Sequence, residues 1–221
     1  MKLCSKNSVS SLTACITVLL AACTSNPPSS AAFMNTYDTK RWSGDVHFKH
    51  IAGDVLDSKV EDRNGTTIYE EEDANTGGGA VWFHYGYFST GLALDFPSLT
   101  FIGQTGFVSP YLGVQLWVAP LQWKGDTGKS DIGMGVSLIE QYPVFKDWKI
   151  GITEHASQNV YRHSEQECCT FADISAIKYY ELGAGAYASF RRRYSIEFQY
   201  GNELNSADNR FYLIASALFG Q

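Results

Sequence analysis

The sequence has 221 residues and a formal net charge of −6, and this charge argues against nucleic acid as a partner because phosphate backbones attract basic surfaces. A chain of this length suits one domain. Aromatic residues make up 14% of the chain and glycines number 20, whereas prolines are few and no long helix-period run is present. This composition is typical of a β protein with tight turns. We expect no cofactor, and the spacing of the Cys and His residues does not favour a metal site.

The N-terminus has the organisation of an export signal. Lys2 and Lys6 form a short positive region, and residues 12–22 are mostly apolar. This apolar stretch has the length of a signal-peptide core and is too short for a spanning helix, which needs about 20 apolar residues. The sequence therefore predicts a signal peptide over residues 1–22.

The signal peptide ends in Leu20-Ala21-Ala22-Cys23, which resembles the lipobox of bacterial lipoprotein precursors. The resemblance implies cleavage before Cys23 and acylation of that cysteine, with palmitate-like chains attached. Two or more chains would be needed for stable membrane binding. Residue 24 is Thr rather than Asp, which resembles the outer-membrane sorting pattern of enteric lipoproteins.

Residues 23–43 are interpreted as a lipidated N-terminus followed by a flexible tether. Residues 24–30 are rich in Ser, Pro and Asn, a composition typical of linkers. The remainder, residues 44–221, is assigned to a single β-barrel domain.

Two-residue periodicity dominates this domain. Tyr194, Ile196 and Phe198, for example, alternate with Ser195 and Glu197, which gives the strand one apolar and one polar face. The pattern predicts an all-β, eight-stranded antiparallel up-and-down barrel with strands over residues 44–56, 80–95, 107–123, 130–142, 147–162, 172–190, 193–203 and 209–219. Residues 97–106 could form a further strand, so that counts of eight and ten both remain open.

Strand length favours a transmembrane barrel over a soluble one. Residues 180–190 extend about 33 Å at about 3.3 Å per residue, and a tilt of about 40° reduces this to about 25 Å, the height of a membrane barrel's apolar band. Aromatic residues end the apolar stripe, as in an interfacial girdle. The domain thus resembles small eight-stranded outer-membrane barrels, and residues 211–219 resemble their C-terminal insertion signal.

Loop lengths predict the orientation. Short links follow the even-numbered predicted strands and longer polar links follow the odd ones, whereas outer-membrane barrels have short periplasmic turns and long external loops. We therefore expect both termini in the periplasm, long loops outside, and the acyl chains of Cys23 in the inner leaflet of the outer membrane. Membrane lipid is the expected partner.

His155 and Ser157 form the candidate catalytic pair of the sequence. Two residues apart on a strand, they share a face, and a His can take a Ser proton as general base. The pair resembles that of outer-membrane phospholipase A and the lipid A deacylases, which implies an orienting group such as Glu165, Glu167 or Glu181. The strand phase, however, predicts that both side chains point into the lumen, away from acyl chains.

Cys168 and Cys169 remain after export and are candidates for a strained vicinal disulfide or for a bridge to another chain, with a loop staple preferred. Three functions stay open. The preferred one is a structural or surface-interaction role without a wide pore, since eight strands leave the interior filled. The others are a lipid esterase using His155 and Ser157, and a soluble lipid-tethered barrel that binds an apolar ligand.

Overall fold

The computed structural model describes residues 26–53, 60–61, 67–68, 73–96, 100–119, 132–163, 175–205 and 209–220. The predicted signal peptide, the lipidation site Cys23, Glu165 and the pair Cys168 and Cys169 lie outside the described residues. Within the described part of the chain, no helix is long and apolar enough to cross a membrane.

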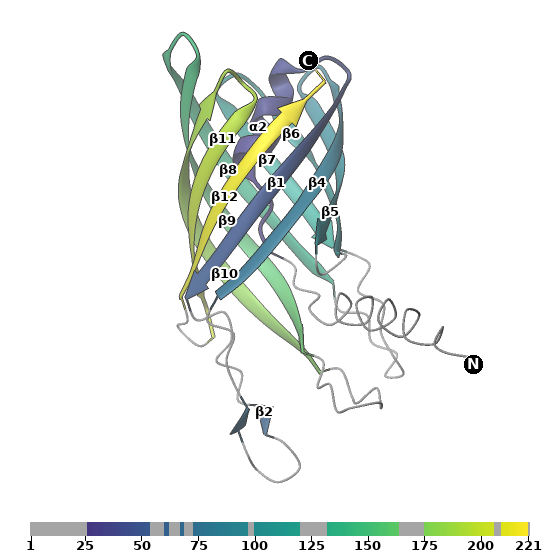
Figure 1. Cartoon of the computed structure of the whole chain (residues 1–221), viewed down its shortest axis with the longest axis vertical. Coiled ribbons are helices and arrows are strands. Elements are labelled where there is room, and N and C mark those ends of the chain that lie inside the picture. The colour runs from purple at the N-terminus through teal and green to yellow at the C-terminus, as the bar shows by residue number, and fades with distance from the viewer. Residues whose placement is uncertain are drawn as a thin grey trace, which may run out of the picture.

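The chain forms a closed antiparallel barrel in which each strand pairs with its neighbours in sequence (Figure 1). The barrel strands are β1 (Trp42–Gly53), β4 (Asp73–Tyr85), β5 (Phe88–Phe96), β6 (Thr100–Val108), β7 (Leu112–Ala119), β8 (Gly133–Phe145), β9 (Trp148–His163), β10 (Ser175–Phe190), β11 (Tyr194–Glu203) and β12 (Asn209–Phe219). The barrel closes where β1 pairs with β12, from Gly44 opposite Phe219 to Gly53 opposite Arg210. A separate two-stranded sheet joins β2 (Val60–Glu61) to β3 (Thr67–Ile68).

The all-β up-and-down architecture is confirmed, but the barrel has ten strands and the prediction of eight is wrong. Residues 80–95, predicted as one strand, contain a reverse turn between β4 and β5. Gly86 occupies this turn with φ of +63°, a conformation open to glycine but costly for most residues. The possible extra strand at residues 97–106 is real and forms β6, and the predicted strand 107–123 spans the turn from β6 into β7.

The barrel strands turn apolar residues outward, and their inward side carries most of the polar side chains together with a smaller set of apolar ones. On β11, Ile196 and Phe198 are 64% and 49% exposed, whereas Glu197 and Gln199 are each 1% exposed. On β10, Leu182, Ala184 and Ala186 face outward and Glu181 faces inward. The predicted faces are confirmed, and this contradicts a soluble barrel whose apolar stripes point inward.

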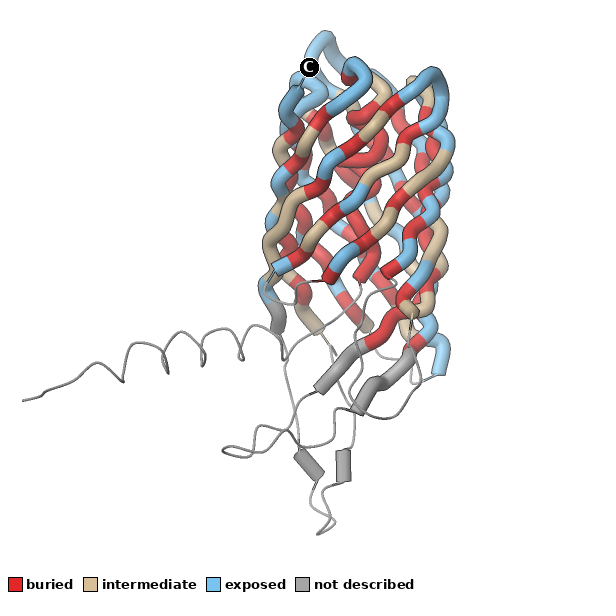
Figure 2. The backbone as a smooth tube through the Cα atoms, turned by 90° about the vertical axis from the view of Figure 1, so that its right-hand side faces the viewer, coloured by how far each residue is buried: buried red, intermediate tan, exposed pale blue. Residues whose placement is uncertain are grey.

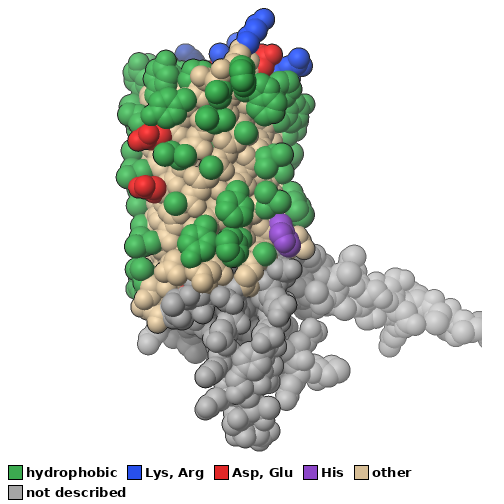
Figure 3. Space-filling model, turned by 90° about the vertical axis from the view of Figure 1, so that its left-hand side faces the viewer, with side chains coloured by type: hydrophobic (Ala, Val, Ile, Leu, Met, Phe, Trp, Pro, Cys, Tyr) green, Lys and Arg blue, Asp and Glu red, His purple; other side chains and the backbone are tan. Residues whose placement is uncertain are grey.

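The outer surface is accordingly apolar along the strands (Figure 3). Figure 2 shows the same alternation of exposed and buried residues along each strand. Glu140 on β8 and Glu154 on β9 interrupt the outer face, and Glu140 accepts a 3.1 Å hydrogen bond from the Tyr142 hydroxyl. Lys and Arg side chains gather beyond one end of the apolar surface.

The short connections all lie at one end of the barrel, which we call the short-turn end. They join β4 to β5, β6 to β7, β8 to β9 and β10 to β11 through residues 86–87, 109–111, 146–147 and 191–193. Strand β1 begins and β12 ends at this same end (Figure 1). The opposite end, where β1, β7, β9 and β11 finish, is called the long-loop end.

Candidate functional site in the barrel lumen

The lumen contains a segment that precedes the barrel in sequence. We call residues 26–38 the plug; they include α2 (Ser30–Asn35) and the short 3-10 helix η1 (Thr36–Asp38). Every residue of α2 is buried, and the helix lies inside the barrel (Figure 1). The interpretation of residues 23–43 as a flexible tether is therefore wrong for the plug. A linker-like composition also suits a segment that must fit among side chains, because small residues occupy little of the lumen.

Local hydrogen bonds cap both ends of the helical part of the plug. The Ser29 hydroxyl accepts a hydrogen bond from the Ala32 amide at 3.1 Å and so caps the N-terminus of α2. At the other end, the Thr36 hydroxyl donates to the carbonyl of Phe33 at 2.6 Å. These bonds satisfy backbone groups that water cannot reach in the lumen.

Glu197 on β11 binds the beginning of α2. Its carboxylate accepts hydrogen bonds from the Ser29 hydroxyl at 2.8 Å and from the backbone amides of Ser30 and Ala31, both at 3.2 Å. The Gln199 side chain donates to the same carboxylate at 2.7 Å. A carboxylate that is 1% exposed is costly unless such donors surround it, so Glu197 and the plug stabilise each other.

Apolar contacts hold the middle of the plug. The Phe33 ring packs against Trp82 of β4, with ring centroids 5.9 Å apart at an interplanar angle of 58°. Met34 lies so close to Gly113 of β7 that a Cβ there would overlap its sulfur. Both plug side chains belong to a buried cluster with Ala31, Ala80, Trp82, Ala93, Ile102, Val108, Trp117, Ala119, Ile139, Tyr187 and Leu218.

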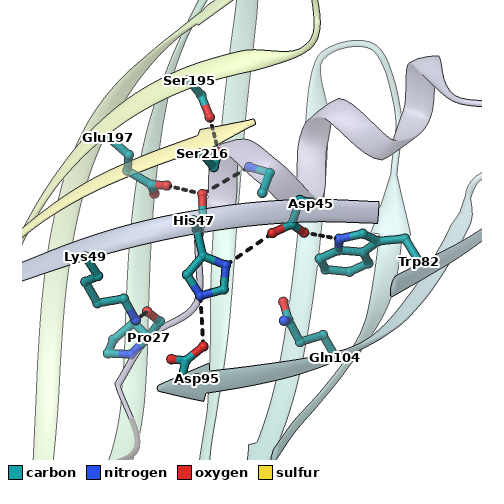
Figure 4. A network of polar contacts seen from close by, with 12 residues as sticks. Pro27, Asp45, His47, Lys49, Trp82, Asp95, Gln104, Ser195, Glu197 and Ser216 are labelled. Atoms are coloured by element: carbon teal, nitrogen blue, oxygen red, sulfur yellow. Dashed lines mark hydrogen bonds and ion pairs between the residues drawn. The ribbon is translucent and has the colours of Figure 1, made fainter. Parts of the chain in front are cut away.

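A polar network lines the wall beside the plug (Figure 4). His47 of β1 lies between Asp45 at 3.1 Å and Asp95 of β5 at 2.8 Å, and Asp45 also accepts a hydrogen bond from the Trp82 indole. The Lys49 ammonium donates to the carbonyl of Pro27 at 2.8 Å. A cavity of about 10 Å³ remains between the plug and this wall, space for about one water at most.

A second network lies on the wall further toward the long-loop end, around Glu181 of β10. The Glu181 carboxylate is 2.8 Å from His155 Nε2 and accepts a 2.7 Å hydrogen bond from the Tyr212 hydroxyl. Arg210 is 3.8 Å from Glu181 and donates to Glu203 at 2.9 Å. The Arg210 guanidinium also lies 4.0 Å over the ring of Tyr179, a cation–π geometry.

Glycines make room for this second network. A Cβ at Gly201 would overlap the Glu181 carboxylate, and a Cβ at Gly183 would overlap the His155 ring. The two side chains therefore lie flat across neighbouring strands rather than projecting into the centre of the lumen. This requirement explains glycine at position 183 of β10 and at position 201 of β11.

The candidate catalytic pair points into the lumen, as the strand phase predicts. His155 and Ser157 are 4% and 7% exposed. The Ser157 hydroxyl accepts a 3.0 Å hydrogen bond from the Asn159 side chain, and His155 bonds through Nε2 to Glu181, one of the three predicted orienting groups. Among the described residues no hydrogen bond joins Ser157 to His155, whose Nδ1 has no partner there. The geometry gives no support to an acyl-ester hydrolase acting at the outer surface.

The polar network around His47 was not predicted, although the residue pattern of β1 indicates it. Asp45, His47 and Lys49 alternate with Val46 and Phe48, which are each 52% exposed. In a barrel with a polar lumen, this alternation places the side chains of Asp45, His47 and Lys49 inside. Among the described residues no three His, Cys, Asp or Glu side chains converge as metal ligands would.

Comparison with known proteins adds structural resemblance only. No family model and no curated protein matches the chain. Among solved structures, the chain resembles Neisserial surface protein A (NspA) at 10% identity and a TM-score of 0.40, covering 81% of this chain and 97% of that one. It resembles the N-terminal β-barrel domain of Pseudomonas aeruginosa OprF (8% identity, TM-score 0.36, 80% and 97% covered) and Ail, the attachment invasion locus protein of Yersinia pestis, in complex with the heparin analogue sucrose octasulfate (8%, 0.36, 81% and 97%). At these values the likenesses support no inference about function.

Proposed function

We propose that this protein is an outer-membrane lipoprotein whose ten-stranded barrel spans the membrane as a plugged, non-conducting body. Its role in this proposal is structural or in interaction at the cell surface, through the segments that connect the strands at the long-loop end. Short turns face the periplasm and the long-loop end faces outward, the usual arrangement of outer-membrane barrels.

The observation that carries the proposal is the combination of an apolar outer surface with a filled lumen that holds the buried polar and charged side chains. A soluble barrel with outward-facing Ile196 at 64% exposure and Phe198 at 49% would expose a continuous apolar surface to water, which soluble monomers avoid. In a bilayer the same surface contacts acyl chains at no cost. Closure through β1 and β12 supports the proposal further, because it leaves no unpaired strand edge in the hydrocarbon.

Aromatic side chains near the ends of the apolar surface fit the two membrane interfaces. At the short-turn end Trp42, Tyr85, Phe145 and Trp148 are exposed, and toward the long-loop end Tyr180, Tyr200 and Phe211 are exposed. Such girdles anchor barrels at the headgroup level. Beyond the short-turn girdle, basic residues at positions 40, 41, 146 and 191–193 suit contact with anionic headgroups.

The lumen argues against transport as the function. A buried helix fills the short-turn half, and the Glu181 network occupies the wall of the other half. A water-filled channel of the porin type needs a wider and emptier lumen. A role exercised at the barrel's ends is therefore preferred to one exercised through its interior.

Fractionation of a Cys23→Ser variant tests the proposal when the native signal peptide is replaced by one that does not need Cys23 for cleavage, so that no uncut apolar segment holds the chain in the membrane. If strands span the membrane, the variant remains in the membrane fraction after carbonate washing and needs detergent for extraction, and the detergent-extracted protein migrates differently before and after boiling. Release of Cys23→Ser by carbonate would contradict a spanning barrel. For the wild-type protein, mass spectrometry should find acyl chains on Cys23, and an unmodified Cys23 would contradict the lipoprotein assignment.

A further inference from the structure

We infer that the chain threads its own barrel, so that the acyl chains of Cys23 enter the membrane leaflet at the long-loop end. This inference deepens the proposed function and rests on its lipidation and orientation. It reverses the initial expectation that the lipid lies in the inner leaflet, on the same side as the short turns. Two features of the chain support it: the direction in which the plug runs along the barrel axis, and the short length of chain between Cys23 and Pro27.

The contacts of the plug show its direction along the barrel axis. Pro27 meets Lys49, which lies seven residues into β1 from the short-turn end. The Ser30 hydroxyl is 3.0 Å from the hydroxyl of Thr153, five residues into β9.

The later residues of the plug contact the rim of the short-turn end itself. The Asn35 side chain donates to Ser189 at 3.2 Å, one residue before the end of β10. Asp38 then pairs with Lys149 at 2.6 Å and with Arg192 of the turn at 3.2 Å. The plug thus advances toward the short-turn end with increasing residue number, and the chain before Pro27 leads the opposite way.

Chain length then limits where Cys23 can lie. Pro27 is four residue steps from Cys23, and these steps span at most about 14 Å when the chain is fully extended. From Lys49, the long-loop rim at Gly53 is about 10 Å away along the axis, given about 3.3 Å per residue and a tilt of about 40°. The short-turn rim at Trp42 is about 18 Å away by the same estimate, through a lumen that the plug already fills. Cys23 therefore reaches the long-loop rim and cannot return to the short-turn side.

The segment is chemically suited to pass through a barrel. Residues 24–36 contain no charged side chain, and the wall supplies the partners that their backbone needs through Glu197 and Lys49. The barrel closes between its first and last strands, β1 and β12, so pairing of these two strands around the plug would leave the segment threaded through the lumen. The acylated cysteine is thus delivered to the outer surface by closing the wall around the segment that follows it.

A disulfide tests threading. Ser30→Cys with Thr153→Cys, in a Cys168→Ser, Cys169→Ser background that keeps Cys23, joins plug to wall. We expect an oxidised form whose mobility on denaturing gels changes on reduction, while Ser30→Cys alone gives none. No crosslink in a barrel that is still heat-modifiable would overturn threading while leaving the proposed spanning barrel intact.

An epitope tests the leaflet. The same short tag is inserted between Ser25 and Asn26, and in a control protein between Lys146 and Asp147 in a short turn. We expect antibody to bind the first tag on intact cells and the second only after the outer membrane is permeabilised. Detection of the first tag only after permeabilisation would overturn the inference, as would detection of the turn tag on intact cells. Heat-modifiability is checked for both tagged proteins, so that loss of the barrel itself is recognised separately.

Discussion

The two halves of the lumen are filled by different means. In the short-turn half a segment from outside the wall, the plug, supplies Phe33 and Met34 to an apolar cluster with Trp82. In the long-loop half, side chains of the wall itself form a charged network around Glu181 and Arg210, beside a small apolar group that includes Tyr212.

This difference shows how a closed wall of strands can also contain a segment of the same chain. Side chains of the wall fold with the strands that carry them, so the charged network of the long-loop half forms between wall residues, and only the beginning of the plug enters that half. The short-turn half depends on residues that must be inside when β1 meets β12. Substitutions should therefore separate the two halves by mechanism: electrostatic in one and packing in the other.

The largest effect is expected at Glu181. Glu181→Gln should lower the free energy of unfolding by about 3–5 kcal/mol, because it removes the buried carboxylate that His155 and Tyr212 contact and leaves Arg210 with Glu203 as its one carboxylate partner among the described residues. Denaturant unfolding in detergent micelles measures it. Glu203→Gln is the matched control: its side chain is 12% exposed, and its loss should be clearly smaller. Equal losses would show that Glu181 has no special place in the network.

Removing the Phe33 ring should cost about 3 kcal/mol, since truncation of a buried Phe leaves a cavity against Trp82. The loss should concentrate in the short-turn half, so amide exchange should rise in β4 and leave the pairing of β10 with β11 protected. Phe198→Ala removes an equal ring from the outer face and serves as control. If Phe33→Ala changes neither stability nor exchange, the plug does not stabilise the barrel.

A charge on the outer face should lower the stability of the barrel by an amount similar to or smaller than the loss of the Phe33 ring. Phe198→Arg places a cation on the apolar face of β11, four residues in from the short-turn end, and should destabilise the barrel in bilayers by about 2–4 kcal/mol. Folding titrations into vesicles measure the change. An unchanged folding free energy would indicate that this face contacts water or another protein rather than lipid.

The smallest effect is expected at the cap of α2. Ser29→Ala removes a hydroxyl that donates to Glu197 and accepts from Ala32, and should cost about 1–2 kcal/mol. Ser29→Thr keeps the hydroxyl and should restore most of that stability. A Thr variant as weak as the Ala variant would mean that the hydroxyl contributes little at this position.

The strand phase was predictable because one physical constraint determines it along each strand. A polar residue such as Glu197 between Ile196 and Phe198 must face away from the apolar side, and this holds whether the barrel has eight strands or ten. Strand number was harder, because the Gly86 turn between β4 and β5 is too short to interrupt the pattern visibly. His155 was correctly placed in the lumen from its phase alone.

The plug could not be predicted, since its residues carry no periodicity that distinguishes a threaded segment from a linker. Six helical residues such as Ser30–Asn35 form a stable helix only when tertiary contacts support them. The contacts with Glu197 and Trp82 that provide this support join residues 168 and 49 positions apart in sequence, Ser29 with Glu197 and Phe33 with Trp82. Only closure of the barrel brings them together.

Quenching of tryptophan fluorescence by brominated lipids tests the central claim, an apolar surface facing lipid around a filled lumen, most directly. Two single-tryptophan proteins are compared in the same vesicles: one retains the lumenal Trp82, which is 1% exposed, and the other carries Ile196→Trp on the outer face. All remaining tryptophans are replaced by Phe in both. The account predicts strong quenching for Ile196→Trp and little for Trp82; quenching of Trp82 equal to or greater than that of Ile196→Trp would contradict it.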